Sequence, residues 1–167
     1  VAICQGIVSG QIDPTSESTA DIARKMSEQI TGNSTQKAVS AAFAVNSGLN
    51  DAWVNPDAAF QGMFLTVFPE LSLMFAAWFT FDSEDNGGTA TFGASDQRWM
   101  TALGSYSGTT ANLKIENTTG GGFNSTAPVP TQDTNYGTLD IDFSDCSNAT
   151  VTYNIPSATQ SGNFSMT

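Results

Sequence analysis

The chain has 167 residues, of which 5 are Lys or Arg and 16 are Asp or Glu, so its formal net charge is −11. This length indicates one domain with an appendage, and it suffices to bury a core without a metal or a disulfide framework. The acidic balance argues against nucleic acids and anionic membranes as partners, because both need clustered basic side chains. The sequence contains no His, which excludes Ser-His-Asp and Cys-His catalysis and His-ligated zinc sites. It also has no apolar run long enough for a transmembrane helix.

Residues 1–36 are predicted to form an N-terminal arm. The part before Pro14 is a short β-like segment. Its apolar members are Ile3, Ile7, Val8 and Ile12. Residues 15–31 are predicted to form a helix, because apolar side chains recur there at intervals of four residues and give one apolar stripe. The stripe consists of Ile22, Met26 and Ile30.

Residues 37–167 are predicted to form a β-domain. Its most apolar stretch, residues 60–82, gives two neighbouring strands that are apolar on both faces, whereas a half-solvated antiparallel strand has polar residues on one face. The later segments alternate, as where Leu113 and Ile115 are separated by Lys114. Short turns separate these segments, which is typical of a meander. The predicted fold is therefore mainly β, an antiparallel meander that closes into a barrel or a two-layer sandwich, with one N-terminal helix.

The second apolar face of the hairpin in residues 60–82 is predicted to be an interface, because the core needs only one face of it. We assign to this second face Met63, Leu65, Met74 and Trp78. The stripe of the helix is its expected cover within the same chain, and the residues before Pro14 are expected to reach outward. A β-like arm can add to the sheet edge of a neighbour, and a head-to-tail contact that does not close gives a filament.

A series of short motifs runs through residues 46–167. In chain order they read NSGLNDAW, QGMF, AWFTFD, FGASDQRW, TTGG, YGTL and DCSNA. In this order they resemble an uncharacterised secreted β-domain of exported proteins from marine and other proteobacteria, with the pattern W-F-T-F-D, R-W, T-T-G-G, G-T-L and F-x-D-C. The resemblance implies a β fold and a secreted or cell-surface protein of a Gram-negative bacterium, and it implies no activity. The arm falls outside it.

The N-terminal end and the two cysteines give information on the cellular compartment in which the protein functions. The chain begins at Val1 without a charged leader, as expected of a mature product whose signal peptide has been removed. A disulfide between Cys4 and Cys146 would tie the N-terminus to a late strand. Sequence cannot decide whether it forms, because the compartment sets the redox state.

The loop that begins at Asp82 imitates the first half of an EF-hand. Asp82, Glu84 and Asn86 offer oxygen ligands at alternate positions, and Gly87 follows. The Glu expected at loop position 12 is replaced by Gly93. A partial Ca²⁺ site is therefore the only cofactor site suggested, and a solvated hairpin loop is the alternative interpretation.

Two further groups of side chains could carry chemistry. Asp140 and Asp142 share one face of a predicted strand, where paired carboxylates could hydrolyse a glycoside or simply keep the strand soluble and unpaired. An aromatic platform for a sugar, or else part of the core, is formed by Trp53, Trp78, Trp99, Tyr106 and Tyr136.

These observations favour a non-enzymatic extracellular structural protein. The predicted function is a self-assembling subunit of a fibre or surface layer, a homo-oligomer or filament that uses its N-terminal arm. The alternative is a secreted carbohydrate- or surface-binding module with a glycan as partner. A hydrolase ranks behind both.

Overall fold

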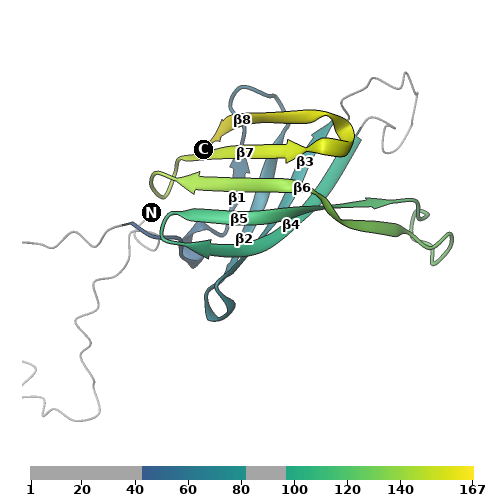
Figure 1. Ribbon diagram of the computed structural model, residues 1–167, viewed down its shortest axis with the longest axis horizontal. Coiled ribbons are helices and arrows are strands. Elements are labelled where there is room, and N and C mark those ends of the chain that lie inside the picture. The colour runs from purple at the N-terminus through teal and green to yellow at the C-terminus, as the bar shows by residue number, and fades with distance from the viewer. Residues whose placement is uncertain (1–42, 82–96) are drawn as a thin grey trace, which may run out of the picture. The chain divides into compact units, whose positions relative to one another are not determined.

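The computed structural model describes residues 43–81 and 97–167, so the predicted arm and its helix lie outside the described residues. The described chain forms strands and short 3-10 turns (Figure 1). The strands are β1 (Ala52–Val54), β2 (Gly62–Phe68), β3 (Leu73–Phe81), β4 (Gln97–Ser107), β5 (Thr110–Thr119), β6 (Thr131–Phe143), β7 (Ala149–Ile155) and β8 (Gln160–Met166). The turns are η1 (Ser47–Leu49), η2 (Pro69–Leu71) and η3 (Pro156–Ala158).

The strands form a single antiparallel sheet of 8 strands in the order of the sequence. Its first and last strands meet, because the backbone N–H of Val54 donates to the carbonyl oxygen of Thr167 at 3.0 Å and the reverse bond measures 3.1 Å. The sheet is therefore a nearly closed barrel. This confirms the predicted mainly β antiparallel meander and decides between its two forms in favour of the barrel.

Two of the hairpin turns repeat one local design. Pro69 and Pro156 each begin a 3-10 turn, because the proline ring fixes the backbone angle that the turn requires. Ser72 and Thr159 then end these turns in the left-handed region, with φ of 51° and 54°. Their backbone N–H groups donate to the carbonyl oxygens of Pro69 and Pro156, both at 3.1 Å. The two turns thus set the registers of β2 with β3 and of β7 with β8.

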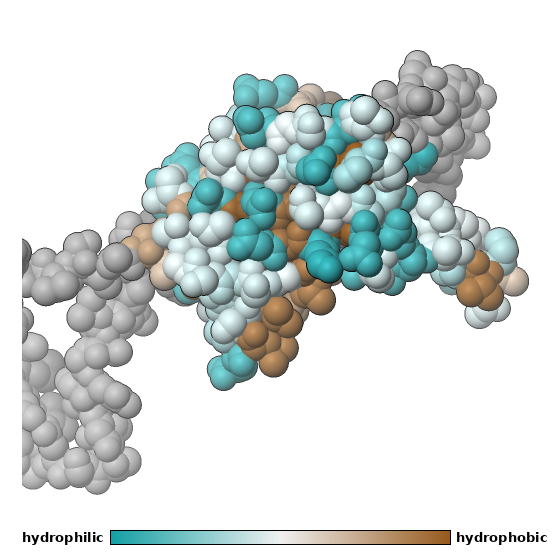
Figure 2. Space-filling view, viewed as in Figure 1, coloured by the Kyte–Doolittle hydropathy of each residue, from teal (hydrophilic) through white to brown (hydrophobic). Residues whose placement is uncertain are grey.

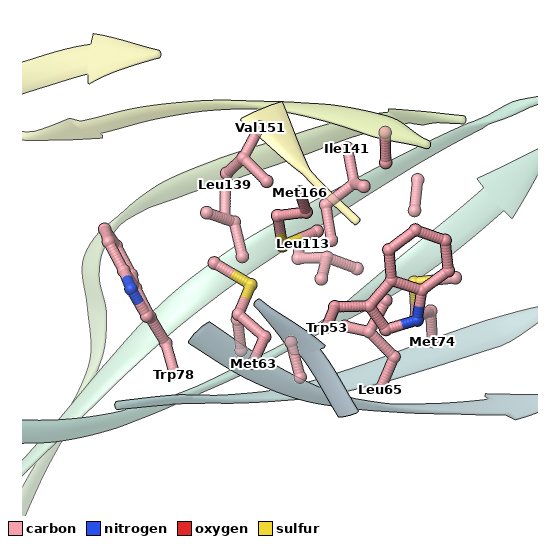
Figure 3. Close-up of a cluster of buried hydrophobic side chains, with 14 of the residues drawn as sticks. Trp53, Met63, Leu65, Met74, Trp78, Leu113, Leu139, Ile141, Val151 and Met166 are labelled. Carbon is pink, nitrogen blue, oxygen red and sulfur yellow. The ribbon is translucent and has the colours of Figure 1, made fainter. Parts of the chain in front are cut away.

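On strands β5–β8, alternate residues face outward and inward, as their sequence predicts, except at the start of β6, where residues 131–135 are all exposed. The outward residues, such as Lys114, Thr138 and Thr152, are exposed, and this side of the barrel is mostly hydrophilic (Figure 2). The inward residues are apolar, and Leu139 and Ile141 are fully buried. Figure 3 shows them packed against side chains from β2 and β3 across the interior. Burial of these apolar side chains is the main driving force that holds the barrel together.

The predicted assignment of faces on the β2–β3 hairpin is wrong. Met63, Leu65, Met74 and Trp78, expected at an interface, are 2, 3, 0 and 8% exposed and point into the barrel (Figure 3). The opposite face, which carries Phe64 and Phe79, lies outside. Because both faces of the hairpin are apolar, alternation alone could not distinguish the inner face from the outer one.

Candidate functional site

One end of the barrel contains a cavity of about 360 Å³. It lies where β3 ends and β4 begins, and where β7 ends and β8 begins, since Phe81 pairs with Gln97 and Ile155 with Gln160. Strands β3–β8 and the loop between β1 and β2 all contribute side chains to its lining. Its volume lies at the lower end of the range of about 300–1,000 Å³ that is usual for small-molecule sites.

The wall of the cavity that faces the core is aromatic. Trp78 on β3 contacts Tyr153 on β7 edge-on, with ring centroids 5.3 Å apart. Phe164 on β8 lies 5.8 Å from Trp78 and 6.3 Å from Tyr153. These three rings join strands far apart in the sheet and separate the cavity from the aliphatic core.

The position of Tyr153 depends on a glycine in the next strand. Tyr153 pairs with Gly162, and a Cβ atom on Gly162 would lie 2.9 Å from the Tyr153 hydroxyl oxygen. The missing side chain therefore leaves the space in which the ring of Tyr153 lies across β8.

A β-bulge places a second tyrosine at the cavity. Gly137 pairs with Ile115 and Asp133 pairs with Asn117, so the register of β5 with β6 shifts between these pairs. Bulges bend a strand and redirect its side chains. Tyr136 lies within this irregular stretch, is half-buried and lines the cavity.

The rim of the cavity is rich in amide side chains, and two of them are held in a fixed orientation. The Thr80 hydroxyl donates to Gln61 Oε1 at 2.8 Å, and the backbone N–H of Asp57 donates to Asn55 Oδ1 at 3.0 Å. With their oxygens engaged, these amides present their NH₂ groups. The other amides at the rim are Asn117, Gln160 and Asn163.

The charge of the cavity differs from that of the whole protein. Among the described residues that line it, Arg98 is the one charged side chain and none is Asp or Glu, although the chain has a net charge of −11. The carboxylates of the described chain therefore lie outside this cavity, which is suited to an uncharged ligand more than to a cation.

The predicted aromatic platform does not form as a unit. Trp53 is 4% exposed, donates its indole N–H to the Leu49 carbonyl oxygen at 3.0 Å, and lies at the opposite end of the core from Trp78 (Figure 3). Trp99 is 54% exposed on the outer face, and Tyr106 packs against the core away from the cavity. Of the five aromatic residues of the predicted platform, only Trp78 and Tyr136 line the cavity.

Asp140 and Asp142 lie on the exposed outer face of β6, away from the cavity. Each carboxylate accepts a hydrogen bond from β5: the Asn112 amide donates to Asp140 Oδ1 at 2.7 Å, and the Thr110 hydroxyl donates to Asp142 Oδ1 at 2.5 Å. This arrangement supports the interpretation that they solubilise and brace the strand, because both carboxylates are exposed, bonded to β5, and not among the described residues that line the cavity.

The metal and disulfide predictions fall partly outside the described chain. Asp82, Glu84 and Asn86 lie outside the described residues, and within residues 43–81 and 97–167 no cluster of three or more acidic, Cys or His side chains could hold a metal. Cys146 is disulfide-bonded, and Cys4, its predicted partner, lies outside the described residues. No helix in the described part of the chain has the length and apolar character needed to cross a membrane.

The outward side of β2–β4 is a second candidate site, which we call the outer apolar face. Its exposed apolar side chains, on these strands and beside them, are Val54, Phe64, Phe68, Leu71, Phe79, Phe81, Trp99 and Leu103. Phe64 and Phe79 meet edge-on with centroids 5.7 Å apart and an interplanar angle of 88°, and Phe79 pairs with Trp99 on β4. The face is thus continuous across three strands.

Comparison with protein families, curated proteins and solved structures found nothing that matches this chain. The resemblance to a secreted proteobacterial β-domain therefore stays a prediction.

Proposed function

We propose that the protein is a non-enzymatic structural subunit that assembles with copies of itself into a fibre or surface layer outside the cell. The outer apolar face carries this proposal. Phe64 is 56% exposed and Trp99 is 54% exposed, and large contiguous apolar patches on a soluble domain mark interaction sites more often than chance.

The charge distribution favours a second copy as the partner on this face. A net charge of −11 makes copies repel one another, so association is favoured at a surface with few carboxylates. Glu70 in the turn η2 is the one charged residue between β2 and β3. Strands β2 and β3 contain no charged residue. The outer side of β5–β8, by contrast, displays Asp140 and Asp142.

The N-terminal arm of the second copy is the segment that we assign to this face. The arm joins the barrel near Phe43, which packs against the core, and Val45, whose backbone N–H donates to the Gly108 carbonyl oxygen at 2.8 Å. An extended chain covers about 3.3 Å per residue, so the residues before Phe43 are long enough to reach a neighbour. The apolar residues expected to dock are Ile3, Ile7, Val8 and Ile12.

Export is part of the proposal. Disulfides persist in oxidising compartments, such as the bacterial periplasm and the cell exterior, and Cys146 is disulfide-bonded. This bond supports a location outside the cytosol.

The experiment measures the mass of the native particle by light scattering. We expect the wild-type protein to be larger than a monomer, and the combined variant Phe64→Ser, Phe79→Ser and Trp99→Ser to be a folded monomer. A wild-type monomer, or a triple variant of unchanged mass, would refute the proposal. The matched control replaces three exposed residues on the outer side of β5–β8, in the combined variant Lys114→Ser, Thr138→Ser and Thr152→Ser. This variant should keep the wild-type particle mass.

Deletion of residues 1–14 tests the arm. Because this deletion removes Cys4, it is made together with Cys146→Ser and compared with the full-length double variant Cys4→Ser, Cys146→Ser. We expect the deletion to give a folded monomer while the double variant still assembles. If the truncated protein keeps its mass, the contact is made by the outer apolar face alone and the role of the arm is refuted.

A further inference from the structure

We propose that the cavity at the end of the barrel is a binding site for an uncharged sugar, one or two pyranose units of a neutral glycan. The cavity and the outer apolar face share Phe81 at their border. The other lining residues of the cavity lie outside that face, so the proposed binding does not depend on self-assembly. Three observations lead to this ligand class: the pairing of aromatic and amide groups, the orientation of the amides, and the absence of carboxylates among the described lining residues.

The aromatic wall matches one side of a sugar ring. A pyranose presents C–H bonds on its faces, and the negatively charged face of an aromatic ring attracts such C–H groups. Tyr136 and Tyr153 are half-buried at the cavity, so part of each ring stays accessible to a ligand. Trp78 is 8% exposed and closes the inner wall behind them.

The amides match the edge of a sugar ring. Gln61 and Asn55 present NH₂ donors because their oxygens are already engaged, by Thr80 and by the Asp57 backbone. Within the described chain, the side chains of Asn117, Gln160 and Asn163 have no hydrogen-bond partner in the protein. An amide both donates and accepts, and a sugar hydroxyl does the same, so these groups complement a ring of hydroxyls.

The size and charge narrow the class further. A cavity of about 360 Å³ has room for a small ligand but not for a long segment of a protein chain. No described lining residue is a carboxylate, so a cationic ligand or a divalent metal finds no counter-charge among these residues. Arg98, the one charged residue among them, already takes part in another interaction, so its charge does not require an anionic ligand. A neutral saccharide is the ligand that uses the aromatic and amide groups together.

Backbone geometry forms part of the site before a ligand arrives. Tyr136 lies within the irregular stretch of β6, and the missing side chain of Gly162 leaves room for the ring of Tyr153. A preformed site loses less conformational entropy on binding than a flexible one, which favours detectable affinity for a small ligand.

Isothermal titration calorimetry on the full-length protein tests the proposal. The probes are glucose, maltose, cellobiose, lactose and N,N′-diacetylchitobiose, with glucuronic acid as the charged comparison. We expect saturable binding of at least one neutral saccharide and weaker or no binding of glucuronic acid. Asn117→Ala and Tyr136→Ala should each weaken binding about tenfold, which corresponds to about 1.4 kcal/mol.

Trp99→Ala is the control, because it changes the outer apolar face and leaves the cavity untouched. It should bind the same saccharide with unchanged affinity even if the particle mass falls, so failure of the assembly proposal and failure of this one are distinguishable. The inference is overturned if no neutral saccharide binds, if both cavity variants bind like wild type, or if glucuronic acid binds more tightly than every neutral probe.

Discussion

The barrel has two halves, strands β2–β4 and strands β5–β8, and both present apolar side chains to the interior. On the exterior, β2–β4 present apolar side chains and β5–β8 present polar ones. Met74 on β3 and Ile141 on β6 are both 0% exposed. On the outside, Phe79 is 44% exposed on one side of the barrel, whereas Asp140 and Asn112 form a hydrogen-bonded pair on the other.

This difference separates the requirements of folding from those of recognition. A barrel needs only its inner face to be apolar, and β5–β8 meet that requirement with polar outer residues. An outer face of large apolar side chains adds nothing to the core and increases the risk of aggregation. The proposed self-association would account for such a face, and the following predictions test how far the face contributes to folding.

The largest loss of stability is expected when a side chain in the barrel interior is truncated. The loss should be equal in strands β2–β4 and in strands β5–β8. Met74→Ala and Ile141→Ala each remove a fully buried side chain and should each lower the free energy of unfolding by about 2–5 kcal/mol. Urea denaturation of both variants in the Phe64→Ser, Phe79→Ser, Trp99→Ser background avoids a contribution from self-association. A clearly smaller loss for Met74→Ala would show that the apolar half is held by contacts outside the barrel.

The fold of the later strands could be predicted from sequence because each has one apolar face. Ala111, Leu113 and Ile115 are buried, and the residues between them are exposed or half-buried, as their alternation predicts. On β2 and β3 alternation fails, because Phe64 and Leu65 are equally plausible core residues. Closure of the barrel also lies beyond local patterns, since it depends on Val54 and Thr167 meeting from opposite ends of the domain.

The candidate site was less predictable than the fold. The sequence indicates Trp78 and Tyr136 as candidate sugar-binding residues, but no local signal separates them from Trp53, which is buried in the core. The cavity forms from the ends of strands β3–β8, and its residues meet only after pairing registers are set. One usable signal is present in the sequence: Tyr153 and Phe164 each lie between two polar residues, as inward-facing strand residues do. Which end of the barrel they line depends on strand direction and pairing.

A smaller effect on stability is expected from changes to the two outer faces. Phe64→Ser breaks the edge-on contact with Phe79, and Asp140→Ala removes the acceptor of the Asn112 amide. All these side chains are exposed, so each change should lower the free energy of unfolding by no more than about 1 kcal/mol.

Thermal denaturation of both variants at matched concentration measures these losses, and light scattering on the same samples measures association. Only Phe64→Ser should reduce the particle mass. If Phe64→Ser instead destabilised the monomeric barrel as much as an interior truncation, the outer apolar face would have a role in folding, and the comparison between the two halves would fail.

The smallest effect on stability is expected from a change in the turn between β6 and β7, on the polar half of the barrel. The backbone N–H of Ser147 donates to Asp145 Oδ1 at 2.7 Å, and the Asn148 amide donates to both carboxylate oxygens at 3.0 Å. These bonds, that of Ser147 first, hold the pKa of Asp145 below its ordinary value of 3.8. Because the folded pKa lies below the unfolded one, this stabilisation is complete above about pH 3.8 and is lost as the pH falls through the folded pKa.

Asp145→Asn should therefore be slightly less stable than wild type at neutral pH, and the difference should disappear in acid. Urea denaturation from pH 7 to pH 2 measures it. Asn148→Ala keeps the Ser147 bond, which is the larger cause of the shift, so its unfolding curve should show a pH dependence intermediate between those of wild type and Asp145→Asn. A difference between wild type and Asp145→Asn that persisted unchanged at low pH would mean that the carboxylate acts through packing of the turn and not through its charge. The hydrogen bonds at the turn would then hold the backbone equally well with the carboxylate of Asp145 or with the neutral amide of Asp145→Asn.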